Sequence, residues 1–219
     1  MKQSRMTIAL AALAGLASSA AALAQDAVRT EDIGAFSRLD AGGRFDVRFS
    51  PADTPSIRLE GDAEDIAEIE FDIRNGELEI RQDRGAFGWF RRQRALDVTV
   101  HVSAPDVTAF NFSRGIVADV TGLAGGDFDF NVSTGSNSRF SGTCDYANIN
   151  VSTGANLNGR ELVCDSIRVN ASTGSSITVN ASESLTANVS TGADVRSLTE
   201  PASVRANTST GGDVRIGSR

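Results

Sequence analysis

The chain has 219 residues, a formal net charge of -7 and a single histidine. An acidic balance argues against general nucleic-acid binding, because contacts to phosphates require a positive surface. Glycine is abundant with 21 residues and proline is scarce with 4, which suits a chain with many tight turns.

Residues 1–24 have the pattern of a secretory signal peptide. Lys2 and Arg5 precede an apolar run at 6–17, and an Ala-Leu-Ala cleavage site ends the segment. The apolar run is too short for a transmembrane anchor. We therefore expect an exported protein of the periplasm, the cell surface or the extracellular space, and not an integral membrane protein.

Residues 25–106 are expected to form an N-terminal β region. Alternation of apolar and polar residues predicts strands at 45–49, 57–59, 68–73, 77–81 and 96–102. Asn75-Gly76 is a strong signal for a two-residue hairpin turn, and 62–67 suggests one helical turn. Because an uncovered coil end exposes strand edges, we expect this region to cap one end of the repeats that follow.

An irregular segment at 85–94 interrupts this region and holds the only Trp of the chain. Its candidate partner-binding residues are Trp89, Phe90, Arg91, Arg92 and Arg94. Exposed aromatic and Arg side chains suit contact with a protein, an anionic glycan or membrane headgroups. Alternatively, Trp89 and Phe90 fold back to cover the coil end, and the sequence leaves both interpretations open.

A repeated motif dominates residues 107–219. Asn-x-Ser-Thr-Gly occurs five times, at steps of 18 to 20 residues, starting at Asn131, Asn150, Asn170, Asn188 and Asn207. A degenerate copy starts at Asn111. An alternating strand precedes each copy, and its Gly suits a corner because Gly adopts positive φ without a clash.

This period predicts an all-β fold, a right-handed parallel β-helix with coils of about 19 residues. Equivalent positions would stack one strand spacing apart, about 4.8 Å. The five Asn residues should then form a ladder of amide hydrogen bonds, with rows of Ser and Thr beside it. We expect residues 25–219 to form one continuous domain, with a wide core near Phe128 and Phe130 and a narrower one toward the C-terminus.

The two cysteines occupy equivalent positions of the repeat. Cys144 and Cys164 are 20 residues apart, and each immediately precedes an Asp. Stacked coils would place them within the Cα–Cα range that a disulfide tolerates, and an exported protein meets an oxidising compartment. We predict a Cys144–Cys164 bond that contributes about 3 kcal/mol in the chain-entropy model, with two free buried thiols as the alternative.

Several segments of the chain carry a family resemblance. In chain order they are Gly34-Ala35-Phe36, Gly43-Arg44-Phe45-Asp46-Val47, Gly61-Asp62-Ala63-Glu64, Asn75-Gly76-Glu77-Leu78-Glu79-Ile80, Val98-Thr99-Val100 and Ala104-Pro105-Asp106. With the Ser-Thr-Gly corners, they resemble the head GIN domain family, which is described as "putative auto-transporter adhesins". The resemblance covers nearly the whole mature chain. It implies an exported β-helical domain of the bacterial envelope, and the family supplies no catalytic residues to carry over.

The sequence indicates no catalytic, cofactor-binding or metal site. Enzymes on parallel β-helices that act on acidic polysaccharides need clustered carboxylates with Arg, Lys or His. The mature chain has no Lys, and His101 lies on the polar side of a predicted strand, where a solvated or hydrogen-bonded role is favoured. Recurrent acids occur at Asp127, Asp145, Asp165, Asp194 and Asp213. Turn capping and solubility explain these acids better than Ca²⁺ binding or a carboxylate pair.

The favoured function is therefore an exported, non-enzymatic, adhesin-like interaction module of the envelope or the secreted fraction. Its partner would be an envelope protein or a glycan, not nucleic acid, and no cofactor is expected. A carbohydrate-active enzyme and an ice-binding solenoid remain alternatives, although the Thr residues sit at corners and not on a flat Thr-x-Thr face. The last coil, which ends at Ile216, has no obvious cap, so we also expect a homodimer through coil ends.

Overall fold

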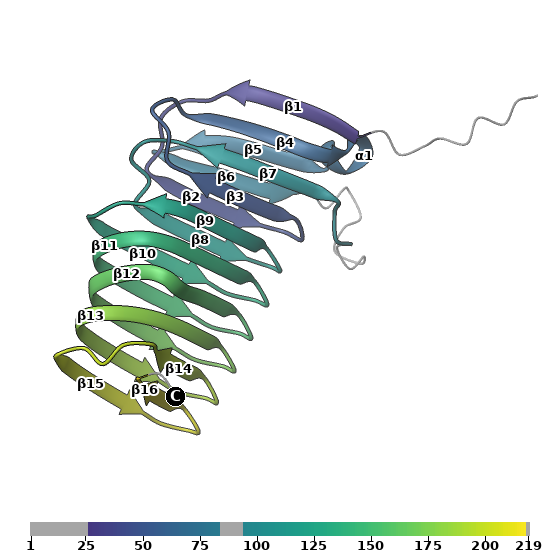
Figure 1. The fold of residues 1–219 in the computed structure, drawn as a ribbon. Helices are drawn as coiled ribbons and strands as arrows, with labels where there is room; N and C mark the ends of the chain where they lie inside the picture. The colour runs from purple at the N-terminus through teal and green to yellow at the C-terminus, as the bar shows by residue number, and fades with distance from the viewer. Residues whose placement is uncertain (1–25, 84–93, 218–219) are drawn as a thin grey trace, which may run out of the picture.

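The protein is a β-solenoid of about five turns whose coils are joined in parallel. The computed structural model describes residues 26–83 and 94–217. All sixteen of the strands described belong to one continuous sheet, which winds into the elongated shape seen in Figure 1. The predicted parallel β-helix is confirmed, whereas its right-handed winding stays a prediction.

Two rows of strands form the long sides of the solenoid. One row, which we call the Asn face, consists of β8 (Ala109–Ser113), β10 (Asp127–Val132), the later parts of β11 (Asn137–Val151), β12 (Asn156–Ala171) and β13 (Ser176–Val189), and β15 (Ser203–Thr208). The opposite face consists of β9 (Val117–Leu123), the first parts of β11, β12 and β13, then β14 (Asp194–Ser197) and β16 (Asp213–Ile216). Parallel pairing keeps equivalent repeat positions in register on both faces.

The interior is filled by the inward residues of each alternating strand. Near the first coils these are aromatic, and the ring centroids of Phe130 and Phe140 lie 4.3 Å apart. Farther along, small residues such as Ala171 and Ala187 occupy equivalent buried positions. Burial of this apolar surface is the main force that holds the coils together.

The corner after each strand is tighter than the sequence suggested. The Thr of every Ser-Thr-Gly copy has a positive φ, as the Gly does; Thr173 has φ 55° and Gly174 has φ 67°. Two successive residues with positive φ define a type I′ turn. A corner Gly N–H also donates to the Thr carbonyl of the next coil, as Gly174 does to Thr191 at 3.0 Å. Hydrogen bonding between coils therefore continues through the corner.

The disulfide prediction is confirmed. Cys144 and Cys164 are register partners in β11 and β12, their Cα atoms lie 4.4 Å apart, and their sulfurs are bonded. The bond links two neighbouring coils where the chain passes from one face to the other.

The N-terminal region both extends and caps the solenoid. The extension is parallel and consists of β2 (Arg38–Gly42), β3 (Asp46–Ser50), β6 (Glu77–Gln82) and β7 (Val98–Ser103). The cap is antiparallel and consists of β1 (Asp26–Asp32), β4 (Ser56–Asp62) and β5 (Ile69–Arg74), with one helical turn, α1 (Ala63–Ile66). Asn75 and Gly76 form the predicted hairpin turn between β5 and β6, both with positive φ.

The C-terminal end of the solenoid differs from expectation. The alternating strand before the last copy of the motif predicts inward side chains at Val204, Ala206 and Thr208, but all six residues of β15 are exposed. β15 pairs only with β13, and β16 only with β14. Since no described strand stacks beyond them, the core of the last coil is left uncovered (Figure 1).

Candidate functional site: a polar groove along the Asn face

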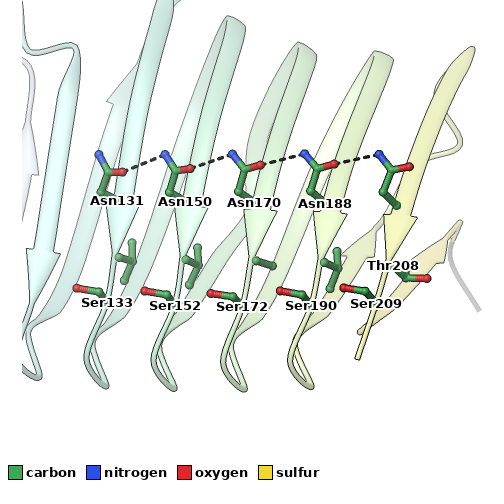
Figure 2. A pocket seen from close by; sticks show the side chains of 15 residues that line it. Asn131, Ser133, Asn150, Ser152, Asn170, Ser172, Asn188, Ser190, Thr208 and Ser209 are labelled. Carbon is green, nitrogen blue, oxygen red and sulfur yellow. Dashed lines mark hydrogen bonds between the residues drawn. The ribbon is translucent and has the colours of Figure 1, made fainter. Parts of the chain in front are cut away.

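Asparagine side chains form a continuous hydrogen-bonded ladder on the Asn face. In each coil, the Nδ2 group donates to Oδ1 of the preceding Asn. The distances are 2.8 Å for Asn131 to Asn111, 3.0 Å for Asn150 to Asn131, 2.9 Å for Asn170 to Asn150, 3.0 Å for Asn188 to Asn170 and 3.0 Å for Asn207 to Asn188. Figure 2 shows the ladder crossing the coils in a straight line. The regular distances follow from the parallel register of the strands beneath.

A row of serines runs parallel to the ladder. It consists of Ser133, Ser152, Ser172, Ser190 and Ser209, each two residues after a ladder Asn. The residue between Asn and Ser is buried in the first four copies, at Val132, Val151, Ala171 and Val189, whereas Thr208 of the last copy is exposed. The serine hydroxyls point in a common direction (Figure 2). The two rows line a groove, which we call the Asn groove, that crosses five coils from Asn131 to Ser209.

The Asn groove retains unused hydrogen-bonding capacity. Within the ladder an interior Asn uses one N–H and one acceptor site of its side chain, so a second N–H and a lone pair remain. Within residues 26–83 and 94–217, the hydroxyls of Ser172 and Ser190 have no protein partner. The residues that line the groove are uncharged. This arrangement suits a neutral ligand that both donates and accepts hydrogen bonds.

Charged and aromatic side chains border the Asn groove. Asp129, Asn148, Arg168, Thr186 and Arg205 form the next outward row on the same face. Tyr146, the only Tyr of the chain, lies two residues before Asn148 on the same strand and is 37% exposed. Tyr146 is not among the candidate residues predicted from the sequence, although its outward parity in the repeat was a usable signal.

The recurrent aspartates serve local structure where the structure shows their partners. Asp145 Oδ2 accepts from the backbone N–H of Gly126 at 3.1 Å, and Asp165 Oδ1 accepts from the Ser182 hydroxyl at 3.0 Å. Among the described residues, no group of three or more His, Cys, Asp or Glu side chains is placed to hold a metal ion.

Most of the predicted contact loop lies outside the described residues, including Trp89, Phe90, Arg91 and Arg92. Arg94 is described, and its guanidinium forms ion pairs with Asp65 and, at 3.0 Å, with Glu68. The hydrogen bond with Asp65 raises the pKa of Arg94. Arg94 therefore ties the chain after the loop to α1, and its contact with a partner stays a prediction.

Asp65 is the buried half of this ion pair. Burial acts to raise its pKa, but hydrogen bonds from Arg94 and the Asp97 N–H, together with the charge of Arg94, outweigh burial and lower the pKa. The Asp97 N–H lies 2.7 Å from Asp65 Oδ2. The carboxylate thus fixes the start of the segment that leads into β7.

Within residues 26–83 and 94–217, no helix has the length and apolar character that crossing a membrane requires. Stacked parallel coils, a capped N-terminal end and a long polar groove define the class of this protein, a β-solenoid with repeated side chains displayed on one face. The chain belongs to the family described as "Putative auto-transporter adhesin, head GIN domain", which it matches over residues 35–201.

Solved structures support the same fold. A "putative adhesin" from Bacteroides fragilis NCTC 9343 has a TM-score of 0.70 at 14% identity, covering 88% of this chain and 97% of that one. A putative adhesin from Parabacteroides distasonis ATCC 8503 has a TM-score of 0.51 at 13% identity, with 88% and 97% covered. One from Parabacteroides merdae ATCC 43184 has a TM-score of 0.50 at 12% identity, with 89% and 97% covered. No curated protein matches the chain.

Proposed function

We propose that this protein is an exported, non-enzymatic, adhesin-like module that binds a neutral, hydroxyl-rich glycan in the Asn groove. It would act in the periplasm, at the cell surface or outside the cell. The family and its structural neighbours are described as putative adhesins, which supports an interaction role. The observation that carries the proposal is the groove of stacked amides and hydroxyls across five coils.

The chemistry of the groove favours a glycan over a protein partner. Protein interfaces draw most of their energy from aromatic and Arg anchors in desolvated pockets, and the lining of the groove contains neither. Amide and hydroxyl groups instead match the donors and acceptors of sugar hydroxyls. The ladder holds the amides in place before binding, which lowers the entropy lost on association.

The repetition of the groove favours a polymer. Equivalent groups recur in successive coils, so a chain of sugar units can contact several coils at once. Weak contacts of this kind gain strength by multivalency without any new contact type. The uncharged lining also supports binding without turnover, because a glycosidase needs two carboxyl groups flanking the scissile bond.

The proposal is tested with immobilised neutral and acidic polysaccharides and the mature protein, by biolayer interferometry. We expect binding to at least one neutral polysaccharide, with little dependence on salt because charge contributes little. The variant Ser172→Ala/Ser190→Ala removes two groove hydroxyls that have no protein partner. Its affinity should fall about tenfold, since two lost hydrogen bonds amount to about 1–3 kcal/mol.

The matched control is Ser176→Ala/Thr178→Val, which removes two outward hydroxyls from the opposite face. It should bind as the unmodified protein does. A panel without any binding to neutral polysaccharides would contradict the proposal, as would equal losses in the two variants.

A further inference from the structure

A second polar hollow lies on the N-terminal region, on the side of the solenoid opposite to the Asn groove. It is formed by the outer surfaces of four neighbouring strands in the order β4, β7, β3 and β9. Its lining is unlike that of the Asn groove, because basic side chains and hydroxyls occur together in it.

Three nitrogen-bearing side chains cross the hollow in one row. Arg58 on β4 is the register partner of His101 on β7, and His101 is the register partner of Arg48 on β3. Neighbouring strands lie about 4.8 Å apart, so two long Arg side chains flank the imidazole at close range.

Hydroxyl groups occupy the next outward row. Ser56, Ser103 and Ser50 are register partners on the same three strands, and Thr121 on β9 also lines the hollow. The Ser103 hydroxyl donates to the Thr54 carbonyl oxygen at 3.3 Å and lies 2.9 Å from the Ser56 oxygen, so Ser56 donates to Ser103. The Thr121 hydroxyl donates to the Phe49 carbonyl oxygen at 3.4 Å. Among these hydroxyls, only that of Ser50 has no partner within the described residues. A hydroxyl donates readily to an anionic oxygen.

Two acidic side chains near the hollow balance the formal charge of its two Arg residues, but one of the two guanidinium groups forms no ion pair with a described residue. Glu60 pairs with Arg58 at 3.0 Å and lies 3.5 Å from His101. Glu60 lies on β4 as well, and the row of Arg58, His101 and Arg48 separates it from the hydroxyls. Asp119 on β9 is the register partner of Arg48, yet within residues 26–83 and 94–217 Arg48 forms no ion pair. Exposed pairs such as Arg58–Glu60 contribute little, so a ligand can compete with them.

The surroundings of the hollow shift the pKa of His101. Burial, followed by the charges of Arg58 and Arg48, lowers the pKa of His101, while Glu60 opposes the change. A lowered pKa favours the neutral ring, so the two Arg residues are the positively charged groups of the hollow. An anion bound between them would counter their effect and raise the pKa of His101.

We propose that this hollow binds a compact oxyanion between Arg48 and Arg58, over the hydroxyl of Ser50. The oxyanion would be a carboxylate, phosphate or sulfate group of an acidic polymer. Guanidinium groups and hydroxyls together form charge-assisted hydrogen bonds to such oxygens. The site is separate from the Asn groove and does not depend on the function proposed for it.

His101 makes the test specific, since it is the only histidine of the chain. The imidazole is titrated by NMR in tag-free mature protein, in sodium sulfate and in sodium chloride at equal ionic strength. We expect sulfate to raise the pKa of His101 by about half a pH unit relative to chloride. Parallel titrations in glucuronate and in glycerol phosphate distinguish a carboxylate from a phosphate as the preferred group.

In the variant Arg48→Gln/Arg58→Gln, the pKa of His101 should be the same in oxyanion and in chloride, whatever its value in chloride. The control Arg168→Gln, on the Asn face, should keep the difference. Equal pKa values of His101 in chloride and in every oxyanion would overturn the proposal. An undiminished difference in the double Arg variant would overturn it as well.

Discussion

At the scale of single residues, the corner threonines are the least expected feature. A β-branched residue with positive φ is strained, and such strain is of the order of 1–3 kcal/mol. Thr153, Thr173 and Thr191 nevertheless adopt this conformation in successive coils, with exposed side chains. Asn or Gly would fit a type I′ turn better. Each of these threonines directly follows a serine of the serine row, but none of the three is among the residues that line the Asn groove.

We therefore predict that Thr173→Asn and Thr191→Asn each stabilise the fold by about 1 kcal/mol, because Asn tolerates positive φ. Thermal unfolding followed by circular dichroism measures the effect. Thr178→Asn is the control, since Thr178 lies within strand β13, where Asn is disfavoured and should destabilise. Lower melting temperatures for both corner variants would show that the turn itself prefers Thr.

The Asp65 carboxylate gives a prediction about pH. Its lowered pKa means that its contribution to stability is present at neutral pH and is lost as pH falls through that lowered value. Asp65→Asn should lower the free energy of unfolding at pH 7 by about 1–3 kcal/mol, as expected for hydrogen bonds to a charged group. The difference from the unmodified protein should shrink below about pH 4, near the ordinary pKa of Asp.

Urea unfolding at several pH values measures this difference. Glu64→Gln, an exposed change in the same helical turn, serves as the control and should have little effect. A deficit in Asp65→Asn that persists unchanged at acid pH would contradict the assigned role of the carboxylate.

At the scale of strands and coils, the Asn ladder couples each coil to its neighbours. Asn170 donates to Asn150 and accepts from Asn188, whereas Asn207 makes one ladder bond to Asn188. Asn170→Ala should therefore lower the free energy of unfolding by about 1–2 kcal/mol and Asn207→Ala by about half as much. Urea denaturation provides the comparison, and equal effects would indicate that the ladder bonds add little to stability.

Much of the stacking of the coils could be predicted from the sequence, because the repeat fixes the register of neighbouring strands. Equal spacing placed Cys144 beside Cys164, and the same spacing aligned the ladder. β1 was missed because it is an exposed edge strand, with Val28 58% exposed and no inward alternation to detect. A short second ladder, Asn156 to Asn137 at 2.8 Å on the opposite face, was also missed, although the repeat placed both residues just after a corner.

The order of the N-terminal layers could not be read from the sequence. β2 and β3 lie between β6 and β7 on one side and β8 and β9 on the other. β6 and β7 therefore stack on the capped side of β2 and β3, although they follow them in the chain. Local alternation marks each strand but carries no information about which distant strand pairs with it. For the same reason, the hollow at Arg48, Arg58 and His101 appears only once the fold is known.

At the scale of the whole molecule, the two ends of the solenoid differ. The N-terminal end is closed by antiparallel strands and α1, whereas no strand of the described residues pairs with the outer edges of β15 and β16 (Figure 1). All six residues of β15 are exposed. Val204 is 38% and Ile216 is 36% exposed at this end. Open edges of this kind pair readily with another chain. A second copy offers an edge of the same kind.

We predict self-association through this end at high protein concentration. Light scattering coupled to gel filtration should show a mass that rises toward a dimer, and Val204→Glu should keep the protein monomeric. Val163→Glu is the matched control, since Val163 is 42% exposed on the side of the solenoid. A constant monomer mass at all concentrations would contradict a role for the open end.

The central claim is that the Asn groove is the ligand-binding surface of this solenoid. The most direct measurement is NMR mapping of isotope-labelled protein, residues 25–219, with the neutral polysaccharide that binds most tightly. We predict that the side-chain amide signals of Asn150, Asn170 and Asn188, and the backbone signals of the adjoining serines, change first and most. Changes confined to the opposite face, to the open C-terminal end or to the hollow around His101 would contradict the claim.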